Sequence, residues 1–599
     1  METTQFYLPK KTGTYADALA AMGLGHLVYL LSAEHPTIRD EGAFFVIERK
    51  EGKYDLDDFA YDTVHDAPGY EYVRLKPEDK EGPIGVPVVE YTEERERLQA
   101  YRKQRDLLAK SHGGRPTAED EEALKGIAPR KGWYLYQNIN VLQGFNSYNS
   151  LHTAIRNSDR TVFAMTMRHK LAALAENREP ITTAKDFAAK DFAPKVAAVQ
   201  AFNPAVGKGI NRPKPDGPVL GGLPSAFVDW FEEWLRYIGI HLSANALSVG
   251  DDIKLFVMAP ANLDEAQAQA IRDDFVSLRL PWSPRQIDIL GALGLVRVLI
   301  DRSGISGADD EMLALFSDAT PSDVIAGLQT AYFTSLGSAK SLTNLSFVGL
   351  PGWFRISDVD TWLAVLSEHE RVIRALDESH SEDASLLVSY RDFLSAGEQG
   401  LSPLLSFLAQ YAPHIMRARD QKKNAPQFTT TNLGRLLLSM DEKKGTLQSI
   451  LDNDGFKNIA GAIRRATVSE QFIKARTGQQ TYEIHYGLFQ DLERKARFQD
   501  QFVAALSAFI TDYNTENARI AERRARSERG GTGNTAGRRR PQITDKDVKD
   551  VMLLIDRHDS EPVAMLLLAY GSAREARDPD TTQDAASEDL STDVVDNDD

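Results

Sequence analysis

The stretch SAFVDWFEEWLRYIGI, residues 225–240, is followed shortly afterwards by DIKLFVMAP, residues 252–260. The first segment repeats apolar side chains at three- and four-residue steps, the spacing of one face of an amphipathic helix: Phe227, Phe231, Trp234, Leu235 and Ile238. The second segment is a short and nearly continuous apolar run, which is typical of a buried strand. A packed helix beside a buried strand predicts a mixed α/β body around this stretch.

The chain before this stretch has the same mixed character. The segments GAFFVIER (42–49) and YEYVRLK (71–77) predict short strands. YTEERERLQAYRKQRDLLAK (91–110) predicts a charged helix. We therefore expect residues 1–280 to form one mixed α+β body.

The chain after this stretch is expected to be mainly helical over residues 281–435. The polar, proline-containing stretch RDQKKNAPQFTTTNLG (419–434) is a linker candidate. Residues 436–577 are then expected to form a helical bundle. Within the bundle, apolar residues recur at helical spacing between 488 and 513: Leu488, Leu492, Phe502, Leu506, Phe509, Ile510 and Tyr513. The predicted fold class is α+β, with a mixed N-terminal body, a helical region and an α-helical C-terminal bundle.

The last eighty residues contain two segments of low apolar content. Residues 523–542 are rich in glycine and arginine and are expected to form a mobile basic loop. A final helix should begin at Thr544 as N-cap, with Asp547 three residues later. Residues 578–599 are expected to be a disordered acidic tail.

Charge is unevenly spread along the 599 residues. The net charge is −17, and the acidic tail alone contributes nine of those negative charges. Residues 456–540 instead hold sixteen Lys or Arg against nine Asp or Glu. A basic region in an acidic chain indicates either a polyanionic partner or a solvated basic helix face, and both interpretations stay open here.

Composition restricts the chemistry and the compartment. The chain has no cysteine, which excludes disulfides, thiolate metal sites and a cysteine nucleophile. The N-terminus METTQFYLPKKTG lacks the apolar core of a signal peptide, and the longest apolar runs are far shorter than a membrane span. We expect a soluble, cytoplasmic protein with no cofactor and no bound metal.

The loop FNPAVGKGINRPKPDG, residues 202–217, contains a GK pair but does not fit a Walker A phosphate loop. That motif needs glycine where Phe202 stands and a hydroxyl residue where Gly209 stands. The loop does carry amide and cationic side chains, which suit base edges and phosphates: Asn203, Lys208, Asn211, Arg212 and Lys214. A DNA-contacting loop and an ordinary structural connection are both compatible with this pattern.

Catalytic signatures are weak. The Asp309–Asp310 pair resembles the metal-binding pair of a polymerase palm, but its surroundings favour a helix start capped by Ser306. His558–Asp559 is a single HD dipeptide without the further ligands that a metal phosphohydrolase needs. The sequence offers no positive case for an enzyme, and a metal-dependent nucleic-acid enzyme of palm or HD type is the alternative hypothesis.

Three segments of the C-terminal bundle resemble a known family: FKNIAGAIRRATV (456–468), YEIHYGLFQDLERKAR (482–497) and FVAALSAFITDYNTEN (502–517). They are similar to the C-terminal region of large subunits of type I CRISPR surveillance complexes, the Cas-eight family of Cascade. Among these complexes, the three segments are most similar to the large subunits of subtypes I-A and I-B, including the Myxococcus-type variant. The similarity covers about 80 residues well, while the rest of the chain matches only in size and in its order of elements.

The resemblance implies a non-enzymatic protein that acts with CRISPR RNA and target DNA. Such subunits assemble with backbone and foot subunits, recognise the protospacer-adjacent motif in duplex DNA, aid strand opening and recruit a helicase-nuclease in antiviral defence. The loop at 202–217 is the candidate for contacting the duplex motif. The bundle would hold displaced single-stranded DNA through Arg464, Arg465, Lys474, Arg476, Arg494, Lys495 and Arg497.

Two further expectations follow from the resemblance. In several relatives a separate small subunit is made from an internal start, and Met440 is the candidate start here, with Met416 as a second candidate. Some Myxococcus-type systems also suggest that such a scaffold can serve regulation or guided transposition instead of defence. The neighbouring genes would separate these roles.

Overall fold

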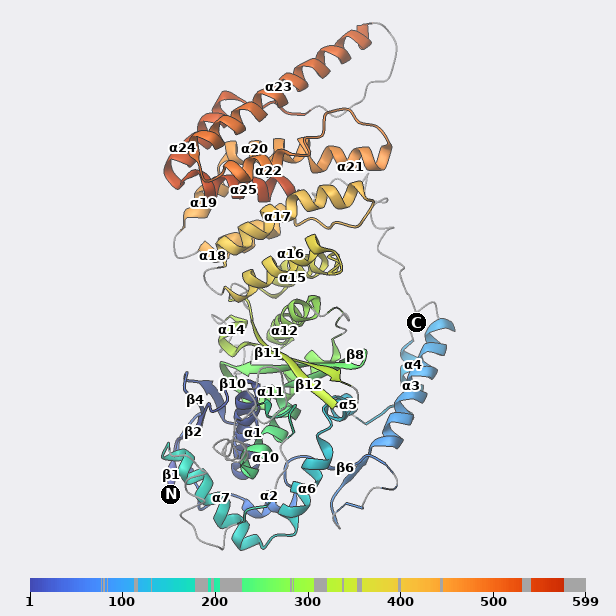
Figure 1. Ribbon diagram of the computed structural model, residues 1–599, viewed down its shortest axis with the longest axis vertical. Helices are drawn as coiled ribbons and strands as arrows, with labels where there is room; N and C mark the ends of the chain where they lie inside the picture. The colour runs from blue at the N-terminus through green and yellow to red at the C-terminus, as the bar shows by residue number, and fades with distance from the viewer. Residues whose placement is uncertain are drawn as a thin grey trace. The chain divides into compact units, whose positions relative to one another are not determined.

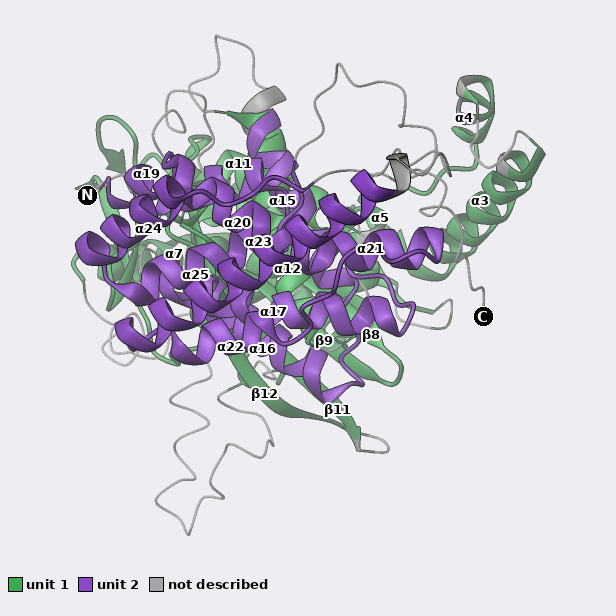
Figure 2. Cartoon of the chain, turned by 90° about the horizontal axis from the view of Figure 1, so that it is seen from above, with its two compact units in different colours: residues 1–359 green, residues 360–599 purple. Residues whose placement is uncertain are grey.

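The computed structural model describes residues 1–575 except 77, 79–80, 83–84, 112–116, 131, 178–191, 195–198, 205–228, 279, 281–282, 284, 306–319, 337–338, 353–357, 397–399, 442–444 and 530–539. The chain divides into two compact units, Met1–Val359 (unit 1) and Asp360–Asp599 (unit 2) (Figure 2). Unit 1 mixes helices and strands, and the described part of unit 2 is built from helices. This architecture confirms the predicted α+β class.

The strands of unit 1 form two four-stranded sheets and two small pairs in the described residues. One sheet has the order β10-β3-β4-β2, and the other has the order β12-β11-β9-β8. The pair β1-β5 is antiparallel and the pair β6-β7 is parallel. The strands are β1 (Glu2–Thr3), β2 (Gln5–Pro9), β3 (Thr37–Asp40), β4 (Phe44–Glu48), β5 (Tyr54–Asp55), β6 (Tyr72–Arg74), β7 (Val88–Glu90), β8 (Ala244–Val249), β9 (Asp252–Pro260), β10 (Asn262–Asp264), β11 (Ile325–Leu336) and β12 (Ala339–Gly349).

Helices surround these sheets (Figure 1). Unit 1 contains α1 (Tyr15–Ser32), α2 (Tyr61–Asp66), α3 (Tyr91–Ser111), α4 (Ala118–Leu124), α5 (Trp133–Val141), α6 (Phe145–Arg156), α7 (Arg160–Ala175), α10 (Trp230–Ser243), α11 (Glu265–Ser277), α12 (Gln286–Ile305) and α14 (Pro321–Val324). Unit 2 contains α15 (Val359–Arg374), α16 (Ser381–Ser395), α17 (Leu401–Asp420), α18 (Thr430–Asp441), α19 (Thr446–Leu451), α20 (Asp454–Ala466), α21 (Val468–Thr477), α22 (Leu488–Lys495), α23 (Gln499–Arg529), α24 (Asp545–His558) and α25 (Ser560–Ser572).

Strand β9 is the segment that the sequence predicts as buried, and it lies inside its sheet between β11 and β8. Its residues from Ile253 to Pro260 are all buried. Helix α12 covers one face of this sheet, where it contacts β11 and β12. Helices α1, α10 and α11 cover the opposite face, where they contact β8 or β9. Coverage on both sides explains why β9 reads as a continuous apolar run.

The hairpin of β11 and β12 is a strand pair that the sequence did not predict within residues 281–435, a range whose described residues are otherwise mainly helical. These strands pair over ten register positions from Gly327 to Leu336, with an irregularity between Tyr332 and Phe333. Their sequences are rich in Thr, Ser, Ala and Gly, so neither presents a long apolar run. Cross-strand pairing stabilises them, and that pairing is a tertiary property.

Helices α1 and α10 cross at backbone contact in unit 1. A Cβ atom on Gly239 would lie 1.9 Å from the Leu19 carbonyl oxygen, and one on Gly23 would lie 1.9 Å from the Leu235 carbonyl oxygen. The crossing therefore accepts only glycine at these two positions without a shift of the backbone. It fixes α10, and with it the residues that flank the loop at 202–217.

Unit 2 confirms two sequence predictions and modifies a third. Thr544 caps α24 in a capping box with Asp547. The apolar stripe of the bundle is buried at the five predicted positions from 502 to 513, all of which lie on α23. The stripe does not lie on one helix, however, because α22 ends at Lys495 and α23 begins at Gln499. On α22, Phe489 is buried and the predicted Leu488 is half-exposed.

The predicted linker at 419–434 is instead packed inside unit 2. The Gln427 amide donates to the Ser572 carbonyl oxygen at 2.6 Å, and the Thr430 N–H donates to the Arg574 carbonyl oxygen at 2.8 Å. Phe428 is buried in the same segment. The boundary between compact units lies at residues 359–360. It divides the expected helical region at 281–435, and only the part from residue 360 onward shares a unit with the bundle.

The basic segment at 523–542 also differs from the expected mobile loop where it is described. Its first residues belong to α23, which extends to Arg529. At its far end Arg540 is buried, pairs with Glu470 at 3.1 Å and stacks 3.7 Å from the centre of the Tyr482 ring. Arg538, Arg539 and the acidic tail at 578–599 lie outside the described residues.

Buried His369 makes the stability of unit 2 sensitive to acid. Burial lowers its pKa from 6.5 to about 3, and its Nδ1 lies 2.7 Å from the Tyr390 hydroxyl. Below pH 6.5 this histidine becomes protonated in the unfolded chain, whereas it stays neutral in the folded chain. We expect the free energy of unfolding to fall by up to about 1.4 kcal/mol per pH unit between pH 6.5 and pH 3 through this group.

The measurement is pulse proteolysis of the full chain in urea at several pH values, with unit 2 peptides identified by mass spectrometry. His369→Gln should flatten the dependence on pH between 6 and 4. His380→Gln is the control because that side chain is 52% exposed. Equal pH slopes for the His369→Gln variant and the wild type would contradict the prediction.

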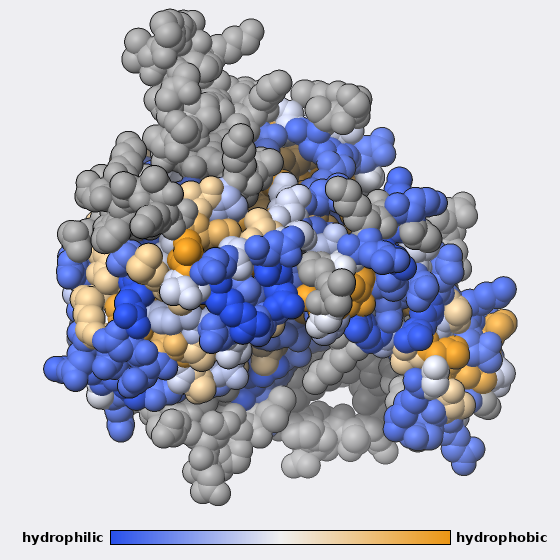
Figure 3. Space-filling model, turned by 90° about the horizontal axis from the view of Figure 1, so that it is seen from below, coloured by the Kyte–Doolittle hydropathy of each residue, from blue (hydrophilic) through white to orange (hydrophobic). Residues whose placement is uncertain are grey.

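The surface seen from below is mainly hydrophilic, with hydrophobic residues in small groups (Figure 3). Within the described ranges no helix is long and apolar enough to cross a membrane.

Candidate nucleic-acid interface

The loop at 202–217 begins from a buried anchor in unit 1. Phe202 is 3% exposed, and its ring lies 5.7 Å from the Tyr237 ring on α10. Asn203 is 0% exposed, and its amide donates to the Glu233 carboxylate at 2.7 Å. Both residues therefore hold the start of the loop against α10.

Asn203 is the one predicted loop residue within the described structure, and its burial corrects its expected role. A side chain enclosed in the core cannot reach the edge of a base or a phosphate. Its amide instead satisfies a buried carboxylate, which is the usual arrangement of a buried polar group. Lys208, Asn211, Arg212 and Lys214 lie outside the described residues.

Glu233 belongs to a buried charged network on α10. Arg236 donates to Glu233 at 2.5 Å and to Glu232 at 2.9 Å, and Lys11 pairs with Glu232 at 2.5 Å. Burial raises the pKa of Glu233, while Arg236 and Asn203 oppose that rise. These partners compensate the buried carboxylates, so the network is structural.

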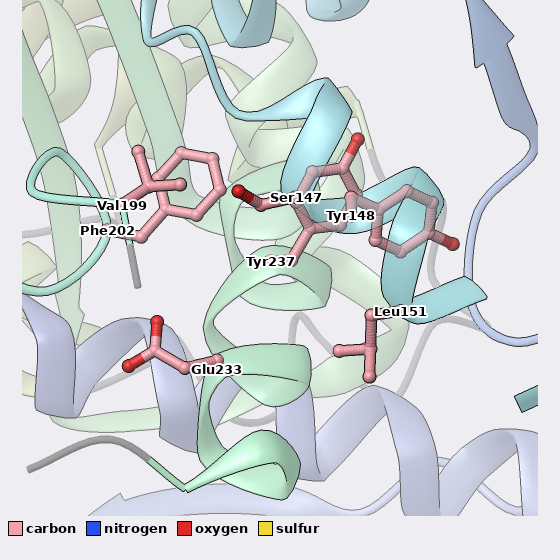
Figure 4. A pocket seen from close by; sticks show the side chains of 7 residues that line it. All are labelled: Ser147, Tyr148, Leu151, Val199, Phe202, Glu233 and Tyr237. Atoms are coloured by element: carbon pink, nitrogen blue, oxygen red, sulfur yellow. The ribbon is translucent and has the colours of Figure 1, made fainter. Parts of the chain in front are cut away.

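A small cavity lies beside this anchor (Figure 4). Its walls come from α6, α10 and the segment before the loop, and the lining residues are Ser147, Tyr148, Leu151, Val199, Phe202, Glu233 and Tyr237. Its volume of about 10 Å³ has room for about one water molecule. It is too small for a nucleotide.

The predicted DNA-binding cations of the bundle differ in how they are used within unit 2. Arg464 is buried and donates to Glu575 and to the Tyr570 carbonyl oxygen, and burial lowers its pKa. Arg465 donates to the Tyr513 hydroxyl at 3.0 Å. Both arginines link helices of unit 2. The burial of Arg464 corrects the expectation that it lines a DNA path, whereas Arg465 is half-exposed and its expected role stays a prediction.

The cations at the end of α22 are more exposed but paired. Arg494 and Lys495 both pair with Asp491, at 2.8 and 2.7 Å. Arg497 pairs with Glu561 at 3.0 Å while its side chain is 78% exposed. Exposed ion pairs are weak, so these residues could still exchange a carboxylate for a phosphate.

Lys474 and Arg476 lie on α21, where both are exposed. Helix α21 ends at Gly478 with φ 71°, a conformation that suits glycine. The chain then turns back, and the Thr481 and Tyr482 N–H groups donate to the Glu470 carboxylate at 2.8 Å. This turn brings Tyr486 back to the side of α21.

Two exposed aromatic side chains flank the last turn of α17 at this place. Phe472 is 38% exposed, with the Arg419 guanidinium 5.7 Å from its ring centre. Tyr486 is 44% exposed, and its hydroxyl lies 3.5 Å from the Asp420 carboxylate. The Gln471 amide donates to Asp420 at 2.8 Å and joins α21 to α17.

We call this region the α17–α21 face: Phe472, Tyr486, Lys422 and Arg476, all exposed. Lys474 is two positions from Phe472 and therefore lies on the opposite side of α21. Lys422 follows the end of α17, and Arg476 lies one turn after Phe472 on the same side of α21. Exposed aromatic rings beside cations suit single-stranded nucleic acid, because the rings stack on bases and the cations contact phosphates.

Sequence reasoning found Lys474 and Arg476 but missed the aromatic residues. In VSEQFIKART, Phe472 would be placed in the core and Glu470 at the surface. The structure reverses these positions, since Glu470 is buried by Arg540 and by the returning chain. No local signal shows this reversal, because it depends on residues about 10 and 70 positions away.

Of the alternative enzymatic residues, His558 and Asp559 lie within the described structure. His558 lies 3.2 Å from the Ser449 hydroxyl, and Asp559 has φ 68° between α24 and α25. Among the residues that the structure describes, no group of three or more His, Asp or Glu could hold a metal ion. Asp309 and Asp310 lie outside the described residues.

No protein-family model matches the sequence, and no curated protein matches it.

Proposed function

We propose that this chain is the non-catalytic large subunit of a type I CRISPR surveillance complex. In this role it recognises the protospacer-adjacent motif in duplex DNA, aids strand opening and recruits a helicase-nuclease in antiviral defence. Its partners are CRISPR RNA, target DNA and the backbone and foot subunits of Cascade. Guide pairing reads the target sequence in such a complex, so the protein needs no catalytic centre of its own.

The α17–α21 face carries this proposal. It lies in the helical unit whose sequence resembles the family, close to the segments that carry the resemblance. It combines Phe472 and Tyr486 with exposed cations, the combination that holds a displaced single strand without reading its sequence. The helical composition of unit 2 is also what the resemblance implies.

Replacing both aromatic residues tests the face directly. Base stacking on an aromatic side chain contributes about 1–3 kcal/mol per base, so removing two rings by Phe472→Ala with Tyr486→Ala should weaken binding by about 30- to 25,000-fold. Fluorescence anisotropy of the full chain with a single-stranded oligonucleotide of random sequence measures this effect. The matched control is Phe347→Ala, an exposed phenylalanine of unit 1.

The assembly itself is tested by co-expression. The tagged full chain, produced with its neighbouring genes and a CRISPR array, should purify as a large particle that contains one RNA of uniform length. The face variant should still assemble, because its changes are at the surface. A monomer without RNA, obtained from an array shown to be processed, would overturn the proposal.

A further inference from the structure

Helix α3 leaves the core of unit 1 after its first turn. Its start is anchored, since the Tyr91 ring lies 4.8 Å from the Trp133 ring and the Thr92 hydroxyl donates to the Leu75 carbonyl oxygen at 2.9 Å. Glu94 accepts the Arg130 N–H at 3.1 Å. Beyond this turn α3 packs mainly against the short helix α4, and both views show the two helices extending away from the sheets (Figures 1 and 2).

The extended part of α3 is covered by little protein. From Arg95 to Lys110 every described side chain is exposed or half-exposed. Leu107 is 56% exposed near the end of the helix. Most helices in proteins are stabilised by packing an apolar face, and α3 offers such a face only to α4. Among the described residues, the remaining surface of the helix is exposed.

The exposed part of α3 is basic. Residues 95–110 hold six Lys or Arg and two acidic residues, in a chain whose net charge is −17. Helix α4, which packs against α3, is acidic instead and holds four Asp or Glu in Ala118–Leu124, so the basic surface belongs to α3 alone. Four of these cations follow the spacing i, i+7, i+8 and i+15, which places them on one side of the helix: Arg95, Arg102, Lys103 and Lys110. At 1.5 Å per residue they span about 22 Å.

We propose that α3 is an arm that binds the phosphodiester backbone of a nucleic acid without reading its sequence. A duplex carries one negative charge per about 1.7 Å of its axis, so about 22 Å of duplex offers about 13 phosphates to the arm. Long Lys and Arg side chains contact phosphates without fixed geometry, which suits a straight helix that lies along a backbone. The inference does not depend on the proposed function, because any nucleic-acid partner would satisfy it.

The test removes the four aligned cations from the full-length protein. The variant Arg95→Gln, Arg102→Gln, Lys103→Gln and Lys110→Gln keeps good helix formers at each position, so circular dichroism should be unchanged. Binding is measured by anisotropy with a 30-base-pair DNA duplex and with single-stranded RNA, both of random sequence, between 50 and 300 mM KCl. The salt slope is the slope of the logarithm of the binding constant against the logarithm of the salt concentration. We expect its magnitude to fall by about 3 and the affinity at 0.1 M salt to fall by about 10- to 1,000-fold.

The matched control removes the same charge elsewhere on unit 1. Arg39, Lys53, Arg160 and Arg168 are exposed cations on other elements, and their replacement by Gln should change the slope by less than about 1. In the opposite direction, Glu96→Gln with Asp106→Asn should tighten binding. The comparison of duplex DNA with RNA shows which backbone the arm prefers.

Equal salt slopes for the α3 variant and the control variant would overturn the inference and would indicate an acidic protein surface as the partner of the arm. This outcome is separate from failure of the proposed function. Loss of particle assembly with intact arm binding would reject the CRISPR role alone, and the reverse result would reject the arm alone.

Discussion

Gly239→Ala should strongly destabilise unit 1. The added Cβ would lie 1.9 Å from the Leu19 carbonyl oxygen and 2.7 Å from the Leu19 carbonyl carbon. Both atoms belong to the backbone of α1, so no side-chain rotation can relieve the clash. Separating the helices would also disturb the buried network of Glu233 and Arg236.

The expected cost is about 3 kcal/mol or more, at the upper end of the range for overpacked cores. Urea unfolding of the full chain, followed by proteolysis of unit 1, measures it. Gly126→Ala is the matched control, because a Cβ at Gly126 meets nothing within 4 Å and the residue has no positive φ. If the two variants proved equally stable, the close crossing of α1 and α10 would be contradicted.

Gly23 offers an independent check of the same crossing. Its Cβ would lie 1.9 Å from the Leu235 carbonyl oxygen, on the other side of the contact. The two glycines share one interface, so the double variant should cost less than the sum of the single variants. Additive costs would instead place the two strained contacts in separate interfaces.

A fragment that begins at Met440 should fail to fold as an isolated monomer. It lacks α17, which packs against α25, α21 and α22. Residues Tyr411, Ile415 and Met416 of α17 are each 2% exposed or less, so their partners in the fragment would face water. Each large apolar side chain contributes about 1.5–3 kcal/mol when buried, and α17 provides several.

The fragment also loses hydrogen bonds that hold its C-terminal end. The segment 427–430 pairs with residues 572–574 in a short parallel contact. A start at Met416 would cut α17 within its buried part. The hypothesis of an internally initiated small subunit therefore requires that another chain replace α17.

The measurement compares two fragments by circular dichroism and by binding of a hydrophobic dye. Residues 360–599 should melt cooperatively, because this range is one compact unit. Residues 440–599 should show reduced helicity, strong dye binding and no cooperative transition. A cooperative melt of the shorter fragment alone would contradict the role assigned to α17.

Several elements could be predicted because their signals are local. The buried strand β9, the helix that begins near Trp230 and the capping box at Thr544 all follow from residues within a few positions of one another. Periodicity and cap chemistry act over one or two turns, so a sequence window contains the whole cause. The α+β class followed from the same signals.

The candidate site could be predicted only in part. Lys474 and Arg476 are exposed as expected, whereas Asn203 and Arg464 are buried by partners that lie 30 or more positions away. Phe472 looks like a core residue by sequence and is exposed in the fold. Whether a polar side chain is buried depends on whether a partner arrives, and the partner comes from a distant part of the chain.

The fold class, the apolar stripes and the uneven charge can all be predicted from the amino-acid order, because they are properties of composition and of short-range periodicity. The pairing of β11 with β12, the burial of Arg540 against Glu470 and the boundary at residues 359–360 cannot be predicted in this way. These features rest on contacts between residues far apart in the chain. Their free energy exists only after the chain has closed the intervening loops.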